Sequence, residues 1–227
     1  MNRRSPPRLR ALLFDVDGVL LDSMRSHARA WQTAVRRIVG GHVARAEVYR
    51  REGEPGAVTA RDFLHLHGRR STAIAVEALL REKERCFKAS GRSVGVYPAA
   101  RPLIRLVEQS GLPAALVTGT SRSEILRVVP AWVRRRFTAL VTGDQVRYGK
   151  PHPEPYRLAC RTLRQDPRQV AVIENAPFGI ASARAAHIGW IIAVGTSLPL
   201  AHLRGADVML PSLGALHRYL RRLLEAN

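Results

Sequence analysis

The stretch Ala11-Leu12-Leu13-Phe14-Asp15-Val16-Asp17-Gly18 predicts a short buried strand that ends in two carboxylates. In extended backbone, side chains two positions apart point the same way, so Asp15 and Asp17 can face one reacting atom. One carboxylate would then serve as a nucleophile or metal ligand and the other as a general acid or base. Gly18 lets the chain turn away sharply after them. Taken alone, the segment is equally compatible with a loop that carries two solvated acids.

The rest of the chain alternates short apolar runs with segments of helical period, which favours βαβ units and a parallel sheet. We expect strands at 11–14, 114–117, 139–141, 170–173 and 190–194, with a weaker edge strand at 208–210. Polar segments of chemical interest follow several of these strands. Open α/β sheets bind their ligands at that edge.

Between Ser23 and about Gly95 the pattern changes, because no convincing strand occurs there. A helix is expected from His27 to Val39, and one face of it carries Ala28, Trp31, Val35 and Ile38. Tyr97-Pro98 marks the return to the sheet. We therefore predict a core domain made of residues 1–22 and 96–227 and a helical insert made of residues 23–95.

Four ordered segments resemble the signature motifs of the haloacid dehalogenase (HAD) superfamily, most of whose members are Mg²⁺-dependent phosphohydrolases. They are Phe14–Ser23, Val117–Thr120, Gly149–Pro153 and Val172–Ile180. The resemblance implies a Rossmann-like α/β core. The place of the insert, after the first motif, is similar to the helical cap of the β-phosphoglucomutase and phosphoglycolate phosphatase branch. Such a cap closes over the site, excludes water and supplies specificity contacts.

The resemblance implies a catalytic role for three residues. Asp15 would attack phosphorus, and Asp17 would protonate the leaving group and later activate water. Lys150 would be a cation between the phosphoryl group and the crowded carboxylates, whose pKa values repulsion would otherwise raise. A solvated loop lysine is the alternative. Only Lys83, Lys88 and Lys150 are lysines in a chain that otherwise uses arginine, and this unusual choice favours a function for Lys150.

Thr118 and Gly119 are the predicted phosphate-binding pair. The hydroxyl of Thr118 and the backbone N–H of Gly119 would meet a phosphate oxygen at a strand-to-helix turn, where the helix dipole also favours an anion. A threonine at the end of a buried strand also has a simpler explanation in its preference for β-structure.

The fourth motif implies a Mg²⁺ site, since Mg²⁺ prefers oxygen ligands in octahedral geometry. The predicted ligands are Asp15, Asp17 through its backbone carbonyl, Glu174 and Asn175. This chain has Glu174-Asn175 where Glu-Asp is more usual in the family. An asparagine carbonyl can bind a metal or hold a ligand water but brings no charge, so we expect a lower Mg²⁺ affinity.

Two cap residues are predicted to meet substrate. Ser23–Trp31 resembles the start of the cap in that branch, with His27 inside it, and Arg81-Glu82-Lys83 resembles a cap stretch whose lysine reaches substrate. A histidine on a helix face and a solvated lysine are the alternatives. Arg50, Arg51 and Glu52, before Gly53, lie where a cap loop could also meet substrate.

Composition limits the classes of protein that remain. The 227 residues are 46% hydrophobic and carry a net charge of +19, with two cysteines. No apolar stretch reaches the length of a membrane span, and the basic N-terminus lacks the features of a signal peptide, so we expect a cytoplasmic protein. The arginines are scattered through nearly every predicted helix, without an aromatic-interleaved stripe, which disfavours a nucleic-acid site. The expected partner is a small phosphorylated metabolite, and the expected state a monomer or homodimer.

The predicted function is hydrolysis of a small phosphomonoester, a sugar phosphate or phosphoglycolate, through an aspartyl phosphate. A phosphosugar mutase of the β-phosphoglucomutase type would use the same residues and remains an alternative. A haloalkanoic acid dehalogenase has no use for Asp17 or Glu174, and a phosphonatase needs an early cap lysine, which is absent between Ser23 and Leu80. A non-catalytic phosphate-binding or nucleic-acid-binding protein is the alternative from another class.

Overall fold

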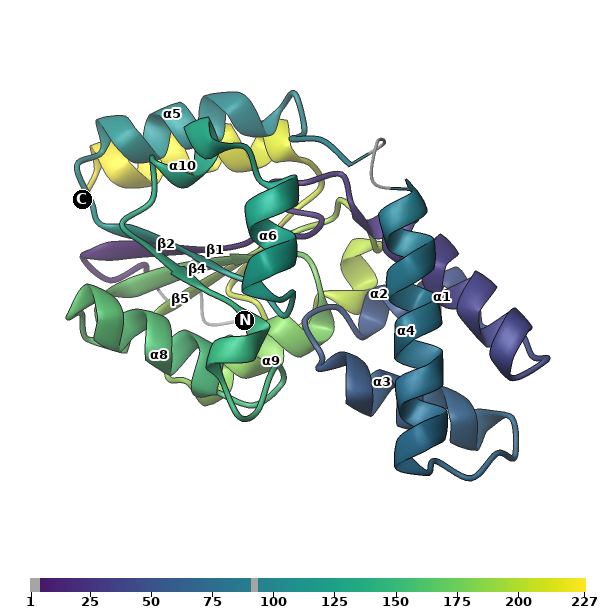
Figure 1. Cartoon of the computed structure of the whole chain (residues 1–227). Helices are drawn as coiled ribbons and strands as arrows, with labels where there is room; N and C mark the ends of the chain where they lie inside the picture. Colours follow the sequence, from purple (N-terminus) through teal and green to yellow (C-terminus); the bar gives the residue numbers. More distant parts are fainter. Residues whose placement is uncertain (1–4, 91–93) are drawn as a thin grey trace.

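A six-stranded parallel sheet organises the protein, and the computed structural model describes it within residues 5–90 and 94–227 (Figure 1). The strand order is β3-β2-β1-β4-β5-β6. The strands are β1 (Ala11–Asp15), β2 (Ala114–Val117), β3 (Ala139–Val141), β4 (Val170–Glu174), β5 (Trp190–Val194) and β6 (Val208–Leu210). All six predicted strands are confirmed, and β1 and β4 each run one residue further than expected.

The register of the central strands brings the motifs to one edge. Phe14 in β1 lies opposite Leu116 in β2 and Ile173 in β4. Asp15 and Glu174 are consequently the last residues of neighbouring parallel strands, so their side chains emerge at the same carboxyl edge of the sheet.

Alternate residues of the strands pack into two separate layers. Leu12 and Phe14 join the apolar cluster that includes α5 and α10, whereas Ala11 and Leu13 join the one that includes α8 and α9. Figure 1 shows these helix pairs on opposite faces of the sheet. Their bounds are α5 (Ala100–Gln109), α8 (Glu154–Leu163), α9 (Pro177–Ala185) and α10 (Leu213–Glu225). The continuous burial of β1 follows from this double cover.

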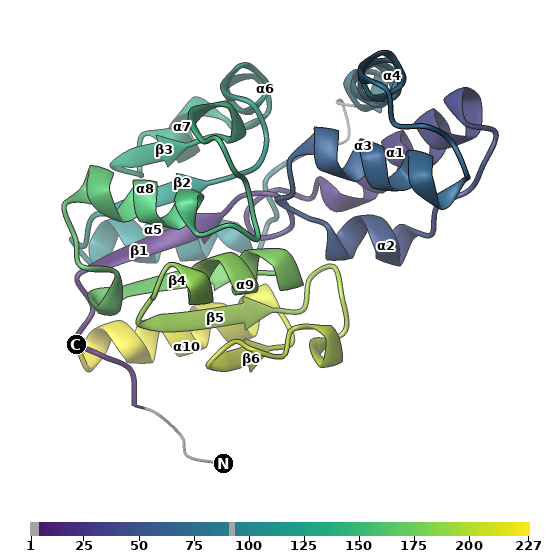
Figure 2. The same ribbon diagram turned by 90° about the horizontal axis from the view of Figure 1, so that it is seen from below.

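Shorter elements complete the connections of the core. They are α6 (Arg122–Val128), α7 (Ala131–Arg134), η2 (Gly143–Gln145), η3 (Pro167–Gln169) and η4 (Leu200–His202). Of these, α6 follows β2 directly and lies near the helical insert (Figures 1 and 2).

Four helices after β1 form a cap beside the carboxyl edge of the sheet (Figure 2). They are α1 (Met24–Ile38), α2 (Arg45–Arg50), α3 (Gly56–Leu66) and α4 (Ala73–Ser90). Trp31 of α1 meets Phe63 of α3 edge to face, with ring centroids 5.3 Å apart. The α/β core with an inserted helical cap is thus confirmed, while the residue boundaries of the two domains stay a prediction.

The predicted helix at 27–39 differs from α1 in two respects. It begins three residues earlier, at Met24, and its expected apolar face was wrong at Ile38, which is 44% exposed. At about 100° per residue, Ile38 falls at the margin of the stripe made by Ala28 and Val35. Val39 lies nearer its centre and is buried instead.

No helix among residues 5–90 and 94–227 is long and apolar enough to cross a membrane. The cytoplasmic location and the oligomeric state stay predictions.

Candidate active site

Lys150 joins two acidic strand ends at the centre of the site. From the loop before α8, its ammonium donates hydrogen bonds to Asp15 Oδ1 at 2.6 Å and Glu174 Oε1 at 2.7 Å. All three side chains are 1% exposed. Burial alone would lower the pKa of Lys150, but Asp15 and Glu174 hold it well above its usual value. Lys150 therefore stays cationic and neutralises charge that the interior could not otherwise hold.

Asp15 presents an oxygen that its neighbours leave free. Burial raises the pKa of Asp15, and the carboxylates of Glu174 and Asp17 raise it further, whereas Lys150 lowers it. Oδ2 of Asp15 is buried and has no hydrogen-bond partner among the described residues. An oxygen so placed is available to a substrate phosphorus or to a cation.

Asp17 is held by four groups from the core and the cap. Its Oδ1 accepts from Ser23 Oγ at 2.6 Å and lies 3.4 Å from His27 Nε2, while its Oδ2 accepts from the hydroxyls of Thr118 at 3.1 Å and Thr120 at 3.2 Å. Burial opposes ionisation of Asp17, but His27, Ser23 and Thr118 together lower its pKa below the ordinary value. In this arrangement Asp17 is a carboxylate and can act as a base.

The predicted phosphate-binding pair lies beside Asp17. Besides donating to Asp17, the hydroxyl of Thr118 accepts from the backbone N–H of Thr120 at 3.1 Å. Gly119 lies against Gly53 of the cap, since a Cβ added to Gly119 would lie 3.0 Å from the Gly53 carbonyl oxygen. The structure thus places both residues at the site, and their contact with phosphate stays a prediction.

Three glycines let the cap and core backbones touch. A Cβ on Gly53, whose φ is +79°, would collide with the Lys150 side chain. A Cβ on Gly143 would in turn collide with the carbonyl of Gly119. We call Gly53, Gly119 and Gly143 the glycine contact. It brings the cap loop onto the catalytic lysine, an approach that only residues without side chains permit.

Glu174 and Asn175 show what the predicted metal site can offer. Oε2 of Glu174 accepts from the backbone N–H groups of Asn175 at 2.9 Å and Ala176 at 3.3 Å. Asn175 donates its amide to Ser197 Oγ at 3.2 Å, and its Oδ1 is buried with no partner among the described residues. Within those same residues, no group of three or more His, Cys, Asp or Glu could hold a metal ion. The Mg²⁺ ligands, Asp17 included, therefore stay a prediction.

The two predicted cap residues, His27 and Lys83, line a cavity between the cap and the core. The ring of His27 is stacked on Phe87, with centroids 4.2 Å apart, and reaches Asp17 from α1. The ammonium of Lys83 lies 5.1 Å from the centre of the Phe87 ring and 5.9 Å from that of Trp31. The cap thus brings a cation and an aromatic wall toward the reacting carboxylates.

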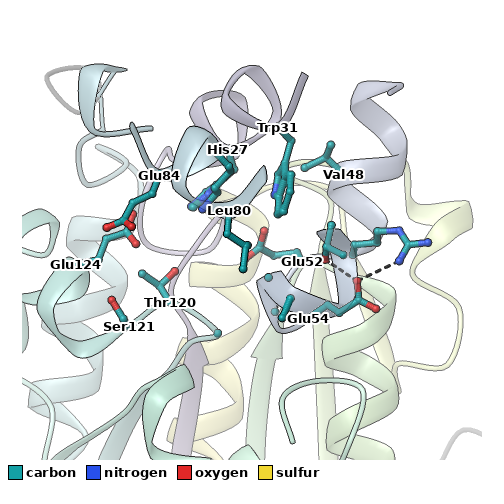
Figure 3. A pocket seen from close by; sticks show the side chains of 17 residues that line it. His27, Trp31, Val48, Glu52, Glu54, Leu80, Glu84, Thr120, Ser121 and Glu124 are labelled. Carbon is teal, nitrogen blue, oxygen red and sulfur yellow. Dashed lines mark hydrogen bonds and ion pairs between the residues drawn. The ribbon is translucent and has the colours of Figure 1, made fainter. Parts of the chain in front are cut away.

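A cavity of about 340 Å³ lies between the cap and the core (Figure 3). The cap lines it with residues of all four of its helices and of the loop after α2, and the core lines it with residues that follow β2. Its polar side chains include Glu52, which the sequence placed in a cap loop, and Glu84, Thr120 and Glu124, which it did not indicate. Asp15 and Asp17 are not part of this lining, but two of its residues, His27 and Thr120, contact Asp17.

Comparison with known proteins identifies the family. The family model described as haloacid dehalogenase-like hydrolase matches residues 9–187. The chain belongs to this family. Hexitol phosphatase A of Escherichia coli (strain K12) is 30% identical over 212 residues, covering 91% of this chain and 92% of the relative. Fructose-1-phosphate phosphatase YqaB of the same strain is 31% identical over 183 residues, covering 79% and 93%.

The structure of this HAD-like hydrolase is similar to that of β-phosphoglucomutase from Clostridium difficile. The two match with a TM-score of 0.82 over 96% of this chain and 98% of that one. At 18% identity this is a likeness of fold alone. The predicted superfamily and the helical-cap branch are thus confirmed, as is the assignment of the chain to the HAD-type phosphatases.

Several contacts of the site carried no separate signal in the sequence of this hydrolase. Tyr156 donates its hydroxyl to Glu174 Oε1 at 2.6 Å from α8. Ser23 and Thr120 are the last residues of the first and second motifs, and that place was the available clue. Ser197 and Tyr156 stand outside the motifs, so their position depends on the three-dimensional packing.

Proposed function

We propose that this HAD-like hydrolase is a Mg²⁺-dependent phosphatase of a sugar phosphate and works through an aspartyl phosphate. The observation that carries the proposal is the free Oδ2 of Asp15, buried beside the Lys150 ammonium and flanked by Asp17. The names of two relatives, which refer to hexitol and to fructose 1-phosphate, support a phosphorylated carbohydrate as substrate.

In the first step, an Asp15 oxygen attacks phosphorus and forms a new O–P bond as the ester P–O bond breaks. The departing alkoxide takes a proton from Asp17. In the second step, Asp17 accepts a proton from water, and the water oxygen attacks the aspartyl phosphate to release phosphate and regenerate Asp15. Lys150 and the Thr118–Gly119 segment hold the transferring group in line.

Asp17 must carry a proton in the first step, and its present contacts favour the carboxylate. The cap supplies one of those contacts through His27, 3.4 Å away. Substrate entry beside His27 would weaken this contact and so raise the pKa of Asp17 toward the value that an acid needs. The position of the cap is thereby linked to the protonation state that Asp17 needs in the first step.

The residues present suit a Mg²⁺ ion. Asp15 Oδ2 and Asn175 Oδ1 are buried oxygens without partners in the described parts of the chain, and Mg²⁺ is a hard cation that takes oxygen ligands. Asp15, Glu174, Asn175 and the backbone carbonyl of Asp17 would hold it. When bound, Mg²⁺ supplies positive charge that offsets the charge of the phosphoryl group.

A phosphosugar mutase is the second candidate, favoured by the contacts of His27 and Lys83. It would use the same aspartyl phosphate but return the phosphoryl group to a sugar instead of to water.

The test measures phosphate release from sugar phosphates, phosphoglycolate and an aryl phosphate, with Mg²⁺ and with a chelator. We expect Mg²⁺-dependent release that Asp15→Asn lowers by about 10⁴-fold or more. Asp22→Asn is the matched control, because Asp22 belongs to the same motif but is exposed. Release that survives Asp15→Asn would contradict the proposal. Conversion of β-glucose 1-phosphate with a bisphosphate primer, without net phosphate release, would favour the mutase.

A further inference from the structure

The cavity above the reacting carboxylates has a charge opposite to that of the whole chain. Lysine and arginine outnumber aspartate and glutamate by 37 to 18. The cavity lining nevertheless contains four glutamates, Glu52, Glu54, Glu84 and Glu124, against two permanent cations, Arg51 and Lys83. A lining so different from the rest of the surface requires a reason specific to this site.

Arg51 contributes little positive charge to the cavity, because carboxylates surround it. Its guanidinium donates to Glu47 at 2.9 Å, to Glu54 at 3.1 Å and to Asp62 at 2.6 Å. Glu54 also accepts from the Thr59 hydroxyl at 2.6 Å, so Arg51 and Glu54 satisfy one another and their neighbours. Lys83 is the remaining permanent cation of the lining, and it lies over the rings of Trp31 and Phe87.

Glu52 and Glu124, by contrast, line the cavity without joining that cluster. Oε1 of Glu124 is buried and has no hydrogen-bond partner among the described residues. Glu52 lines the same cavity and directly precedes Gly53, which packs against the Lys150 side chain. In Figure 3, Glu124 from the core and Glu84 from the cap point toward one another, and Glu52 lies in the middle of the view.

Such oxygens favour one kind of ligand and reject another. A carboxylate oxygen accepts hydrogen bonds from hydroxyl groups, of which a sugar or polyol has several. A second phosphate or a carboxylate on the substrate would instead meet like charge in a cavity of low dielectric, and like-charge contacts are a common source of specificity. Trp31 and Leu80 add apolar surface for the carbon skeleton.

We propose that Glu52 and Glu124 are specificity residues, which accept hydrogen bonds from hydroxyls of an uncharged phosphorylated sugar or polyol and exclude esters that carry a second anionic group. The proposal rests on the phosphatase function above. It disfavours phosphoglycolate, which carries a carboxylate, and the mutase reaction, which needs a bisphosphate.

The test uses pairs of esters that differ by one anionic group. Glucose 6-phosphate is compared with 6-phosphogluconate, and fructose 1-phosphate with fructose 1,6-bisphosphate, by kcat/KM in the presence of Mg²⁺. We expect the uncharged member of a pair to be preferred by about 30-fold or more. Glu52→Gln with Glu124→Gln should narrow that preference about 10-fold, chiefly by raising kcat/KM for the anionic member.

Glu77→Gln is the matched control, since Glu77 lies on α4 outside the cavity and its side chain is 60% exposed. It should leave the preference unchanged. The inhibition constant of fructose 1,6-bisphosphate against turnover of an aryl phosphate gives a second readout, which should fall in the double variant.

The outcomes separate the two proposals. Equal kcat/KM for both members of each pair, or a preference that the double variant leaves intact, would overturn the role of Glu52 and Glu124 while the phosphatase function stands. Absence of phosphate release from every ester, the aryl phosphate included, would overturn the phosphatase function itself.

Discussion

The active site has a floor, the buried residues at the strand ends, and a roof, the residues that line the cavity, and the two are built in opposite ways. In the floor, Asp15, Lys150 and Glu174 are fully buried, and each group neutralises or orients its neighbour. In the roof, Glu52 and Lys83 are partly exposed, and neither has a carboxylate–ammonium partner in the described residues. A buried network tolerates no change of charge, whereas a partly exposed lining does. The reaction is therefore fixed by the floor, and the choice of substrate is left to the roof.

The sharpest test of this difference removes one functional carboxylate from each region. Asp17→Asn should lower kcat by about 10³-fold to 10⁴-fold, because the amide can neither donate the proton nor accept one from water. Glu52→Gln should change kcat on an uncharged sugar phosphate by less than about 10-fold. Both are measured as phosphate release at saturating substrate and Mg²⁺. Similar losses in the two variants would break the distinction between floor and roof.

Removal of the central cation should affect stability and its pH dependence. Lys150→Met leaves Asp15 and Glu174 buried without their counter-ion, and should cost about 3–5 kcal/mol in the free energy of unfolding. Lys88→Met, at a lysine that is 49% exposed, is the control and should cost less than about 1 kcal/mol. Urea denaturation measures both.

The sign of the pH effect follows from Asp15, whose pKa is already raised and would rise further without Lys150. A carboxyl whose pKa is higher in the folded than in the unfolded protein contributes stability at pH below the unfolded value. That contribution is lost as the pH rises through the folded value. The difference in the free energy of unfolding between Lys150→Met and the native protein should therefore be smallest at pH 5 and larger at pH 8. A loss of stability that does not depend on pH would show that buried carboxylates without a counter-ion are not its cause.

The contact between floor and roof can be tested through His27. His27→Phe keeps an aromatic ring against Phe87 but removes the group that lowers the pKa of Asp17. The pKa of Asp17 should rise. As the pH is lowered, the step that needs its carboxylate should therefore begin to slow at a higher pH than in the native protein. We expect about 10-fold lower kcat at pH 6 and a smaller loss at pH 8.

His27→Gln should restore part of the rate at pH 6, since its amide can donate to Asp17. An equal loss at both pH values in His27→Phe would show that His27 serves packing only.

The smallest effect is expected at Arg51, whose charge is already matched by carboxylates of the cap. Arg51→Met removes ion pairs to the partly exposed Glu47 and Asp62 and to the buried Glu54, which keeps its hydrogen bond from Thr59, and should cost about 1 kcal/mol in the free energy of unfolding. The kcat/KM for uncharged esters should change by less than about 3-fold. A loss of turnover above 10-fold would show that Arg51 touches substrate, and the charge argument for the cavity would then fail.

Most of the floor could be predicted from sequence because its residues lie at the ends of recognisable strands, whereas Lys150 was indicated by the third motif. Asp15, Thr118 and Glu174 stand at strand ends, and a parallel sheet brings such ends to one edge. The hydrogen bond from Thr120 to Asp17 was not predicted, because it joins residues 103 positions apart and depends on how the turn after β2 closes.

The residues of the roof were harder to predict from the sequence, for a physical reason. Glu84 and Glu124 lie on different helices, one in the cap and one in the core, and they share a cavity only because of the way these helices pack. A helix period tells which face is apolar but not what that face meets. The exposure of Ile38, which was expected on the apolar face, and the lining role of Glu124 were for that reason not predictable from the sequence.

The glycine contact has a consequence for how this enzyme can vary. Where the cap loop is seated on the core, main-chain atoms of Gly53, Gly119 and Gly143 meet each other and Lys150. The glutamates of the cavity lining are not part of the glycine contact, so they can be exchanged with little change in how near the loop comes to the lysine. For protein engineering, side chains of the cavity lining can be replaced while the main-chain contact between cap and core stays in place.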